Sequence, residues 1–167
     1  MGTAMEQFDV REATPGEYAD AGTATARAYD HILDSTSPEQ AEYRERIADV
    51  SGRATSHVVF VALVGHRVVG SASVELVAHD GTAPEAGFIR MVGIHPDYQG
   101  RGLGRRLVEA CIDRCRQDGK RTVALRTMAA MQVAQALYAS MGFTPDADDD
   151  ISDSSWGTLF AYRLTLT

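Results

Sequence analysis

The segment 88–106, FIRMVGIHPDYQGRGLGRR, constrains the fold of this chain more than any other stretch. Its first part, 88–94, is mostly apolar and β-branched, which predicts a strand, and a helix is predicted from Leu103. The residues between them are rich in glycine and predict a tight turn. The glycines of this strand-to-helix turn are Gly100, Gly102 and Gly104.

The position of these glycines favours an anionic ligand. Backbone amides at the start of a helix have no partner inside the helix, and the helix dipole is positive there, so such a turn can bind a phosphate or pyrophosphate. Residues 99–106 also contain three arginines and no acidic residue. The segment therefore predicts an anionic cofactor.

Two common phosphate-binding loops do not fit the spacing. A Walker loop has Lys followed by Ser or Thr after its last glycine, whereas Gly104 is followed by Arg105 and Arg106. A dinucleotide fingerprint has the spacing G-x-G-x-x-G, whereas the glycines here have the spacing G-x-G-x-G. The pattern that remains is Gln99-x-x-Gly102-x-Gly104.

The rest of the chain predicts an α/β (α+β) fold with a mixed central sheet of about six to seven strands and about four helices. Three consecutive strands up to 88–94 form an antiparallel meander, and the helix after the loop makes a right-handed crossover to a parallel strand. This parallel pair is expected to splay into a slot, and Gly93 indicates a bulge or the close approach of a ligand backbone. The predicted strands are 8–11, 57–64, 68–77, 88–94, 122–126 and 159–166, and the predicted helices are 15–29, 37–50, 103–118 and 131–141.

Length and composition predict one soluble domain, 1–167. The chain has 167 residues, and no apolar run approaches the roughly 20 residues that span a membrane. We expect no membrane partner and, because neither a signal peptide nor a myristoylation site is recognised, a cytoplasmic location. The net charge of −7 argues against nucleic acid as a partner.

The cysteine pattern gives no reason to expect a metal. Cys111 and Cys115 are four residues apart on one predicted helix face, and no second pair completes a metal site. We expect two reduced thiols in the core.

Two motifs resemble those of one enzyme family. The pattern Gln99-x-x-Gly102-x-Gly104 resembles the acetyl-CoA loop of the GNAT acyltransferases. The pattern Ala134-x-x-Leu137-Tyr138-x-x-x-Gly142-Phe143 resembles the second GNAT signature, at the expected distance downstream. On these motifs, which cover about a third of the chain, it is identified as a member of that family.

The resemblance implies direct transfer of an acyl group from acetyl-CoA to an amine, and it implies roles for residues. Backbone amides of the loop would hold the pyrophosphate, Gln99 would support the loop, and Val92 and Ile94 would pair with the pantetheine arm. The amide of Val92 would also polarise the thioester carbonyl. Tyr138 would protonate the departing thiolate, the alternative being that it only packs on the cofactor. The implied cofactor-binding residues are Val92, Ile94, Gln99, Gly100, Arg101, Gly102, Leu103, Gly104 and Arg105.

Two departures from the family pattern leave the general base open. Phe88 stands where many relatives have Glu, and Met131 stands where many have Asn. Glu75 is our candidate for the base, although a solvated carboxylate is the favoured interpretation of that residue. His79 and Glu85 are further candidates.

The acceptor side is less defined. By resemblance alone, Tyr29, His31 and Tyr43 border the acceptor, although packing and surface roles are favoured for each. An acidic run follows the last predicted helix, and it is either a solvated, mobile segment, which we favour, or a loop that attracts a cationic amine together with Trp156. The run consists of Asp146, Asp148, Asp149, Asp150 and Asp153.

The predicted function is N-acetylation of a primary amine, with a small molecule as the first choice of acceptor. A protein or peptide amine is the alternative acceptor. A non-catalytic acyl-CoA sensor is the alternative function, because the usual Glu and Asn are missing. The acyl chain preference is not predicted, and a homodimer is left open.

Overall fold

The computed structural model describes residues 5–77, 85–153 and 157–167. His79 and Trp156 lie outside the described residues. The chain divides into two compact units. The first consists of Met1–Ser73 and Met91–Ala110, and the second consists of Val74–Arg90 and Cys111–Thr167. The expectation of a single domain stays a prediction.

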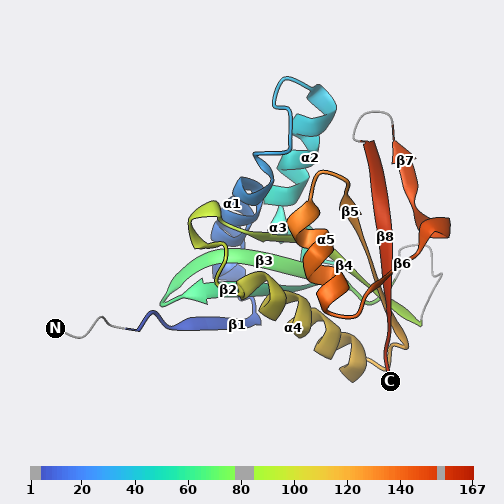
Figure 1. Ribbon diagram of the computed structural model, residues 1–167. Helices are drawn as coiled ribbons and strands as arrows, with labels where there is room; N and C mark the ends of the chain where they lie inside the picture. Colours follow the sequence, from blue (N-terminus) through green and yellow to red (C-terminus); the bar gives the residue numbers. More distant parts are fainter. Residues whose placement is uncertain (1–4, 78–84, 154–156) are drawn as a thin grey trace. The chain divides into compact units, whose positions relative to one another are not determined.

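The described residues form eight strands and five α-helices, with three short 3₁₀ helices between them (Figure 1). The strands are β1 (Phe8–Glu12), β2 (Val58–Val64), β3 (Arg67–Glu75), β4 (Ala86–Ile94), β5 (Thr122–Met128), β6 (Thr144–Pro145), β7 (Ile151–Asp153) and β8 (Gly157–Thr165). The α-helices are α1 (Tyr18–Tyr29), α2 (Pro38–Ala48), α3 (Val50–Arg53), α4 (Leu103–Gln117) and α5 (Gln132–Ser140). The 3₁₀ helices are η1 (Pro15–Glu17), η2 (Pro96–Tyr98) and η3 (Ala147–Asp149).

The strands pair in the order β1-β2-β3-β4-β5-β8-β6, and β7 also pairs with β8. β4 and β5 are parallel, whereas β1 and β2 are antiparallel, as are β5 and β8. The predicted mixed α/β sheet with a parallel pair is confirmed. The strands beyond the predicted six are β6 and β7, which are too short to give a periodic sequence pattern.

In the first unit, the helical segment begins at Pro15 as the sequence predicts, but its first turn is the 3₁₀ helix η1 and α1 follows from Tyr18. The carboxylate of Glu17 accepts a hydrogen bond from the Thr14 amide at 2.8 Å and forms an ion pair with Arg11 at 2.7 Å. Further along the chain, the Ser37 hydroxyl accepts from the amide of Gln40 and caps α2. The predicted second helix is interrupted at Asp49, whose side chain starts the short helix α3.

The apolar core of the first unit lies between helices and strands. The cluster consists of Ala21, Val50, Val59, Val61 and Leu63. Helix α1 also packs closely against α2, because a Cβ atom on Gly22 would lie 2.0 Å from the carbonyl oxygen of Ala48.

In the second unit, β5 holds the central position between two strands. Its residues Thr122–Leu125 pair with Ala86–Ile89 of β4, and its full length pairs with β8. Pairing with β4 therefore ends three residues before β5 does. This is where the sequence predicts a splayed pair.

Helix α4 has an apolar stripe that includes both cysteines. Its members are all buried, namely Leu103, Leu107, Val108, Cys111, Ile112 and Cys115. Both cysteines are free thiols, as expected. Burial raises the pKa of both, that of Cys115 to about 11.

Candidate functional site

The glycine-rich turn has the conformation that its sequence predicts. Gly100 and Gly102 both have a φ of 78°, in the left-handed region that favours glycine, and α4 begins at the next residue, Leu103. No atom lies within 4 Å of the position where a Cβ would stand on either glycine. The turn therefore leaves open space beside the start of a long helix, which suits a phosphate group.

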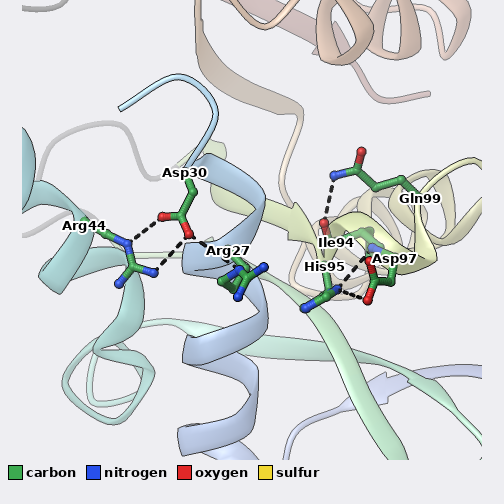
Figure 2. Close-up of polar contacts among 7 residues, drawn as sticks. All are labelled: Arg27, Asp30, Arg44, Ile94, His95, Asp97 and Gln99. Atoms are coloured by element: carbon green, nitrogen blue, oxygen red, sulfur yellow. Dashed lines mark hydrogen bonds and ion pairs between the residues drawn. The ribbon is translucent and has the colours of Figure 1, made fainter. Parts of the chain in front are cut away.

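Gln99 supports this turn through the preceding strand. Its side-chain amide donates a hydrogen bond of 3.0 Å to the carbonyl of Ile94, the last residue of β4 (Figure 2). His95 adds a second local contact, because its Nδ1 accepts from the Asp97 amide at 3.1 Å. The role of Gln99 in supporting a ligand-binding loop stays a prediction.

One backbone hydrogen bond shows which edge of β4 faces β3 before the turn. The His95 amide donates to the carbonyl of Val69 in β3 at 2.7 Å. Because successive residues of a strand turn their backbone groups to opposite edges, Val92 and Ile94 direct theirs away from β3. These are the residues that the sequence proposes for strand-like pairing with an extended ligand.

The irregularity of β4 lies at Met91 rather than at Gly93. Met91 has a φ of 52°, an uncommon conformation for a residue with a side chain. Gly93 instead makes room for α1, since a Cβ there would lie 3.0 Å from side-chain atoms of Thr25 and Ala28. The expectation that Gly93 marks a bulge or a ligand approach is therefore wrong: its lack of a side chain serves helix packing.

Tyr29 connects α1 to the same part of β4. Its hydroxyl donates a hydrogen bond of 3.3 Å to the carbonyl of Val92, and its buried ring packs edge-on against Tyr43 at 6.4 Å. The favoured packing role of these tyrosines thus fits their contacts. His31, the third residue of this group, lies exposed in the turn after α1.

The arginine inside the turn is paired with an acid. Arg101 forms an ion pair of 2.5 Å with Glu6, and its guanidinium lies over the rings of Phe8 and Tyr98. The turn therefore offers its backbone to a ligand, while the Arg101 side chain ties it to the N-terminal segment.

A second charged group lies at the ends of α1 and α2. Asp30 accepts from Arg44 at 2.6 Å and lies 3.6 Å from Arg27 (Figure 2). The hydrogen bond from Arg44 lowers the pKa of Asp30. All three side chains are substantially exposed, so this group is a surface ion-pair network of small energetic weight.

In the second unit, Tyr138 is the buried residue of α5. Its ring packs against Phe143 at 5.8 Å and Tyr162 at 6.3 Å. Ala134, Leu137 and Met141 on the same segment are only partly covered. Burial raises the pKa of Tyr138, with a smaller contribution from Cys111.

Glu75 is not the solvated carboxylate that the sequence favours. It is 6% exposed and forms an ion pair of 2.9 Å with Arg90 of β4. The Arg90 guanidinium also lies 5.7 Å from the centre of the Phe88 ring. Glu75, Arg90 and Phe88 therefore form one cluster, and Phe88 is the residue that stands where many relatives have Glu.

The other candidate base has a different position. Glu85 precedes β4 at its amino end, whereas the glycine-rich turn follows the carboxyl end of that strand. Glu85 is exposed. Its backbone carbonyl accepts a hydrogen bond from the Arg121 amide, and its carboxylate lies 4.0 Å from the Arg121 guanidinium.

The acidic run after α5 is ordered by hydrogen bonds and ion pairs. Arg163 pairs with Asp146 at 3.2 Å and Arg126 with Asp149 at 2.9 Å, while Asp150 accepts from the Ala161 amide at 2.7 Å. The expectation of a solvated, mobile run is wrong for these aspartates. The compensating arginines lie on β5 and β8, so a local scan of the sequence could not find them.

Two polar residues, one half-buried and one buried, escaped the sequence analysis. Arg53 donates to the Ser73 hydroxyl at 3.0 Å and to the carbonyls of Arg46 and Ile47 at the end of α2, and burial lowers its pKa. Thr127 is buried in β5, and its Oγ1 atom has no hydrogen-bond partner among the described residues. A threonine in a strand gives no sequence signal, because threonine is common there.

The described residues contain no group of three His, Cys, Asp or Glu side chains that could hold a metal ion. Within that same part of the chain, none of the helices has the length and apolar character needed to cross a membrane.

The fold and the turn together define a class of protein. A mixed sheet with a glycine-rich turn between β4 and α4 suits a ligand that carries a pyrophosphate and an extended arm. Residues 25–143, more than half of the chain, match the model of the acetyltransferase (GNAT) family. The chain belongs to this family.

Individual relatives agree with this assignment. The chain is 39% identical over 77 residues to mycothiol acetyltransferase of Kocuria rhizophila, covering 46% of this chain and 25% of the relative. It is 31% identical over 84 residues to N-alpha-acetyltransferase 30 of Schizosaccharomyces pombe, covering 50% and 55%. The chain thus spans between a quarter and about half of the length of these relatives.

A solved structure shows the same fold over nearly the full length. The yncA protein of Salmonella typhimurium, whose structure contains its cofactor acetyl-CoA, aligns with a TM-score of 0.72 and 25% identity. The alignment covers 96% of this chain and 94% of the other.

Proposed function

We propose that this protein is an acetyl-CoA-dependent N-acetyltransferase that acts on a primary amine of a small molecule. The observation that carries this proposal is the turn before α4, where Gly100 and Gly102 adopt left-handed conformations beside open space. Membership of the GNAT family and the acetyl-CoA in the similar structure support the choice of ligand.

The turn and the edge of β4 would hold the cosubstrate. We assign the pyrophosphate to the backbone amides of Gly100, Arg101, Gly102, Gly104 and Arg105. Leu103, which is buried, anchors the first turn of α4. The backbone N–H groups of Val92 and Ile94 would pair with the pantetheine arm as a strand does, because their carbonyls already accept hydrogen bonds from Tyr29 and Gln99.

The chemistry needs one proton removed and one supplied. When bound, acetyl-CoA supplies a thioester whose carbonyl carbon gains a bond to the amine nitrogen and loses its bond to sulfur, giving an amide and a thiol. In this proposal the Val92 amide polarises the carbonyl oxygen, which is worth about 3 kcal/mol in well-aligned oxyanion holes.

Tyr138 would supply the proton to sulfur. Because burial raises its pKa, Tyr138 is fully protonated at neutral pH and can donate. The same shift makes it a weaker acid than a thiol near pKa ~8.5, so its contribution is modest unless the bound ligand changes its surroundings.

Glu75 would accept the proton from the amine. A carboxylate that is 6% exposed and paired with Arg90 is held in one orientation, as a general base requires. The assignment accounts for Phe88, because a base on β3 makes the usual Glu on β4 unnecessary.

The small-molecule acceptor is the finer part of the proposal. Two relatives, mycothiol acetyltransferase and N-alpha-acetyltransferase 30, are named for different acceptors. An amine panel must therefore contain amino acids, polyamines, amino sugars and short peptides. The cytoplasmic location remains a prediction.

The first experiment is calorimetric titration with acetyl-CoA of the parent and of Gly102→Glu. The variant places a carboxylate among the amides, and we expect saturable binding to the parent and none to the variant. Gly65→Glu is the matched control, because Gly65 is also left-handed with open space but lies in the turn between β2 and β3.

The second experiment measures release of the CoA thiol with the amine panel. Turnover with a small amine, reduced at least tenfold in Glu75→Gln, supports the proposal. Binding without thiol release above hydrolysis would instead identify an acyl-CoA sensor. Absence of binding to the folded parent would overturn the proposed function.

A further inference from the structure

Arg53 places a half-buried positive charge in the first unit, at the end of α3. Its Nε donates to the Ser73 hydroxyl at 3.0 Å, and its two terminal nitrogens donate to the backbone carbonyls of Arg46 at 2.7 Å and Ile47 at 3.0 Å. All three acceptors are uncharged. The guanidinium is therefore held in one orientation without being neutralised by them.

The charge of Arg53 has no counter-ion in the part of the chain that the structure describes. Burial lowers the pKa of Arg53, and Asp49 offsets only part of this effect. The Asp49 carboxylate instead accepts a hydrogen bond from the Gly52 amide at 2.9 Å and caps α3. A partly buried charge is costly unless it is paired, so an anionic group of a ligand would supply the missing partner.

The guanidinium of Arg53 also has donors left for such a ligand. A guanidinium carries five N–H groups in a rigid plane. The bonds to Ser73, Arg46 and Ile47 use three of them, one on each nitrogen, which leaves two without a partner among the described residues. Each of these can donate a charge-assisted hydrogen bond to an anionic oxygen, and a carboxylate offers two such oxygens.

Two tyrosines connect this charge to the strand that carries Val92. The phenols of Tyr29 and Tyr43 lie close enough to Arg53 to influence its pKa, and the two rings pack edge-on at 6.4 Å. The Tyr29 hydroxyl donates to the Val92 carbonyl at 3.3 Å. All of these residues belong to the first unit. One tyrosine therefore links the neighbourhood of Arg53 to the residue that the proposed function assigns to the reacting carbonyl.

We propose that Arg53 binds a carboxylate of the acceptor, so that the preferred substrates are small amines that also carry a carboxylate, as amino acids do. The inference rests on the proposed function and narrows its acceptor. The carboxylate takes no part in the acyl transfer, so Arg53 is a specificity-determining residue. It acts on the binding of the acceptor and not on the thioester.

The test compares amines that differ only in the carboxylate. Leucine, phenylalanine and methionine are each assayed by release of the CoA thiol, together with the corresponding amino acid amide and the corresponding amine without the carboxyl group. We expect kcat/KM of the parent to be about tenfold or more higher for the amino acid than for either analogue, the effect of a hydrogen bond to a charged group.

Arg53→Gln assigns this preference to the residue. The variant should lower kcat/KM for the amino acid about tenfold or more, mainly through KM, and change the amine without the carboxyl group less than twofold. Arg53→Lys, which keeps the charge, should retain part of the preference. Arg44→Gln is the matched control and should leave both substrates unchanged, because Arg44 of α2 forms an exposed pair with Asp30 (Figure 2).

The substrate pairs separate recognition from a merely structural role. Arg53→Gln also loses the bonds to α2, so its Tm should fall, but this loss would lower the turnover of both members of a pair equally. Equal losses for both members would therefore overturn the role of Arg53. If the variant does not fold, the parent decides: an equal kcat/KM for the amino acids and their analogues would overturn the inference.

The failure of this inference differs from the failure of the proposed function. Acetylation only of amines that lack a carboxylate would overturn the role of Arg53 and leave the N-acetyltransferase in place. No thiol release with any amine, from a folded parent that binds acetyl-CoA, would overturn the proposed function and this inference with it.

Discussion

Tyr29 is the residue that joins α1 to the irregular part of β4. Its hydroxyl holds the carbonyl of Val92, one residue after the left-handed Met91. A non-glycine residue in this conformation costs roughly 1–2 kcal/mol, so neighbouring contacts must stabilise it. The hydrogen bond from Tyr29 is one such contact.

We therefore predict a catalytic effect of Tyr29→Phe. Loss of the hydrogen bond should lower kcat about fivefold, because the Val92 peptide is less well oriented, while the Kd for acetyl-CoA changes less than twofold. Steady-state kinetics and calorimetry measure the two quantities. Tyr18→Phe, at the other end of α1, is the control and should match the parent.

Glu17 predicts how stability depends on pH. The hydrogen bond from Arg11, with those from Thr14, lowers the pKa of Glu17 from 4.5 to about 2. A carboxylate with a lowered pKa in the folded state stabilises the fold above its unfolded pKa, and this contribution is lost as the pH falls from 4.5 towards 2.

Glu17→Gln should consequently reduce the free energy of unfolding by about 1 kcal/mol at pH 7, because it weakens both the helix start and the ion pair. The difference from the parent should shrink below pH 4.5. Urea unfolding at pH 7, 4.5 and 3 tests this. Glu42→Gln, at an exposed position of α2, should have no effect, and a pH-independent deficit in Glu17→Gln would contradict the assignment.

At the scale of elements, the contact of α1 with α2 depends on Gly22. Alanine is favoured over glycine inside a helix by about 1 kcal/mol. At Gly22, however, the added Cβ would lie 2.0 Å from a backbone oxygen of Ala48, so one helix has to move. Sterics therefore outweigh helix propensity at this position.

We predict that Gly22→Ala lowers the free energy of unfolding by about 2 kcal/mol, the cost of overpacking a close contact. Gly16→Ala is the matched control, because no atom lies within 4 Å of a Cβ placed there. Denaturant unfolding compares the two variants. Equal stability would mean that the helices do not approach as closely as described.

The acidic run after α5 gives a second prediction at the scale of elements. Asp149→Asn should lower the Tm by a few degrees, because Arg126 loses a charged partner, whereas the exposed Asp148 should tolerate the same change. Both variants should keep the KM of the parent for the amine. A raised KM in both would support the alternative in which this segment attracts the substrate.

At the scale of the whole molecule, the buried thiols report global unfolding. Cys111 and Cys115 are fully covered by the fold, and their raised pKa values keep them protonated at neutral pH. A thiol reagent at pH 7.5 should therefore react with neither in the native protein and with both in denaturant. Rapid labelling of the native protein would contradict this burial.

The local patterns that the sequence predicted well are those in which neighbouring residues supply the whole cause. The glycine-rich turn, the start of α4 at Leu103 and the buried helix face shared by Cys111 and Cys115 depend on residues within a few positions of each other. The fold class was predicted from the spacing of apolar residues in the strands and helices. The acidic run was misjudged because its partners, Arg126 and Arg163, are distant in sequence.

The sequence by itself therefore determined the class of fold, the position of the glycine-rich turn and the family, because strand and helix periods and a short motif are local properties. The tertiary structure alone decided that Gly93 serves helix packing, that Glu75 is buried beside Arg90, and that the Thr127 hydroxyl has no partner within the part of the chain that the structure describes. These properties depend on which atoms of distant segments meet. Burial and pairing arise only when the strands and helices pack together.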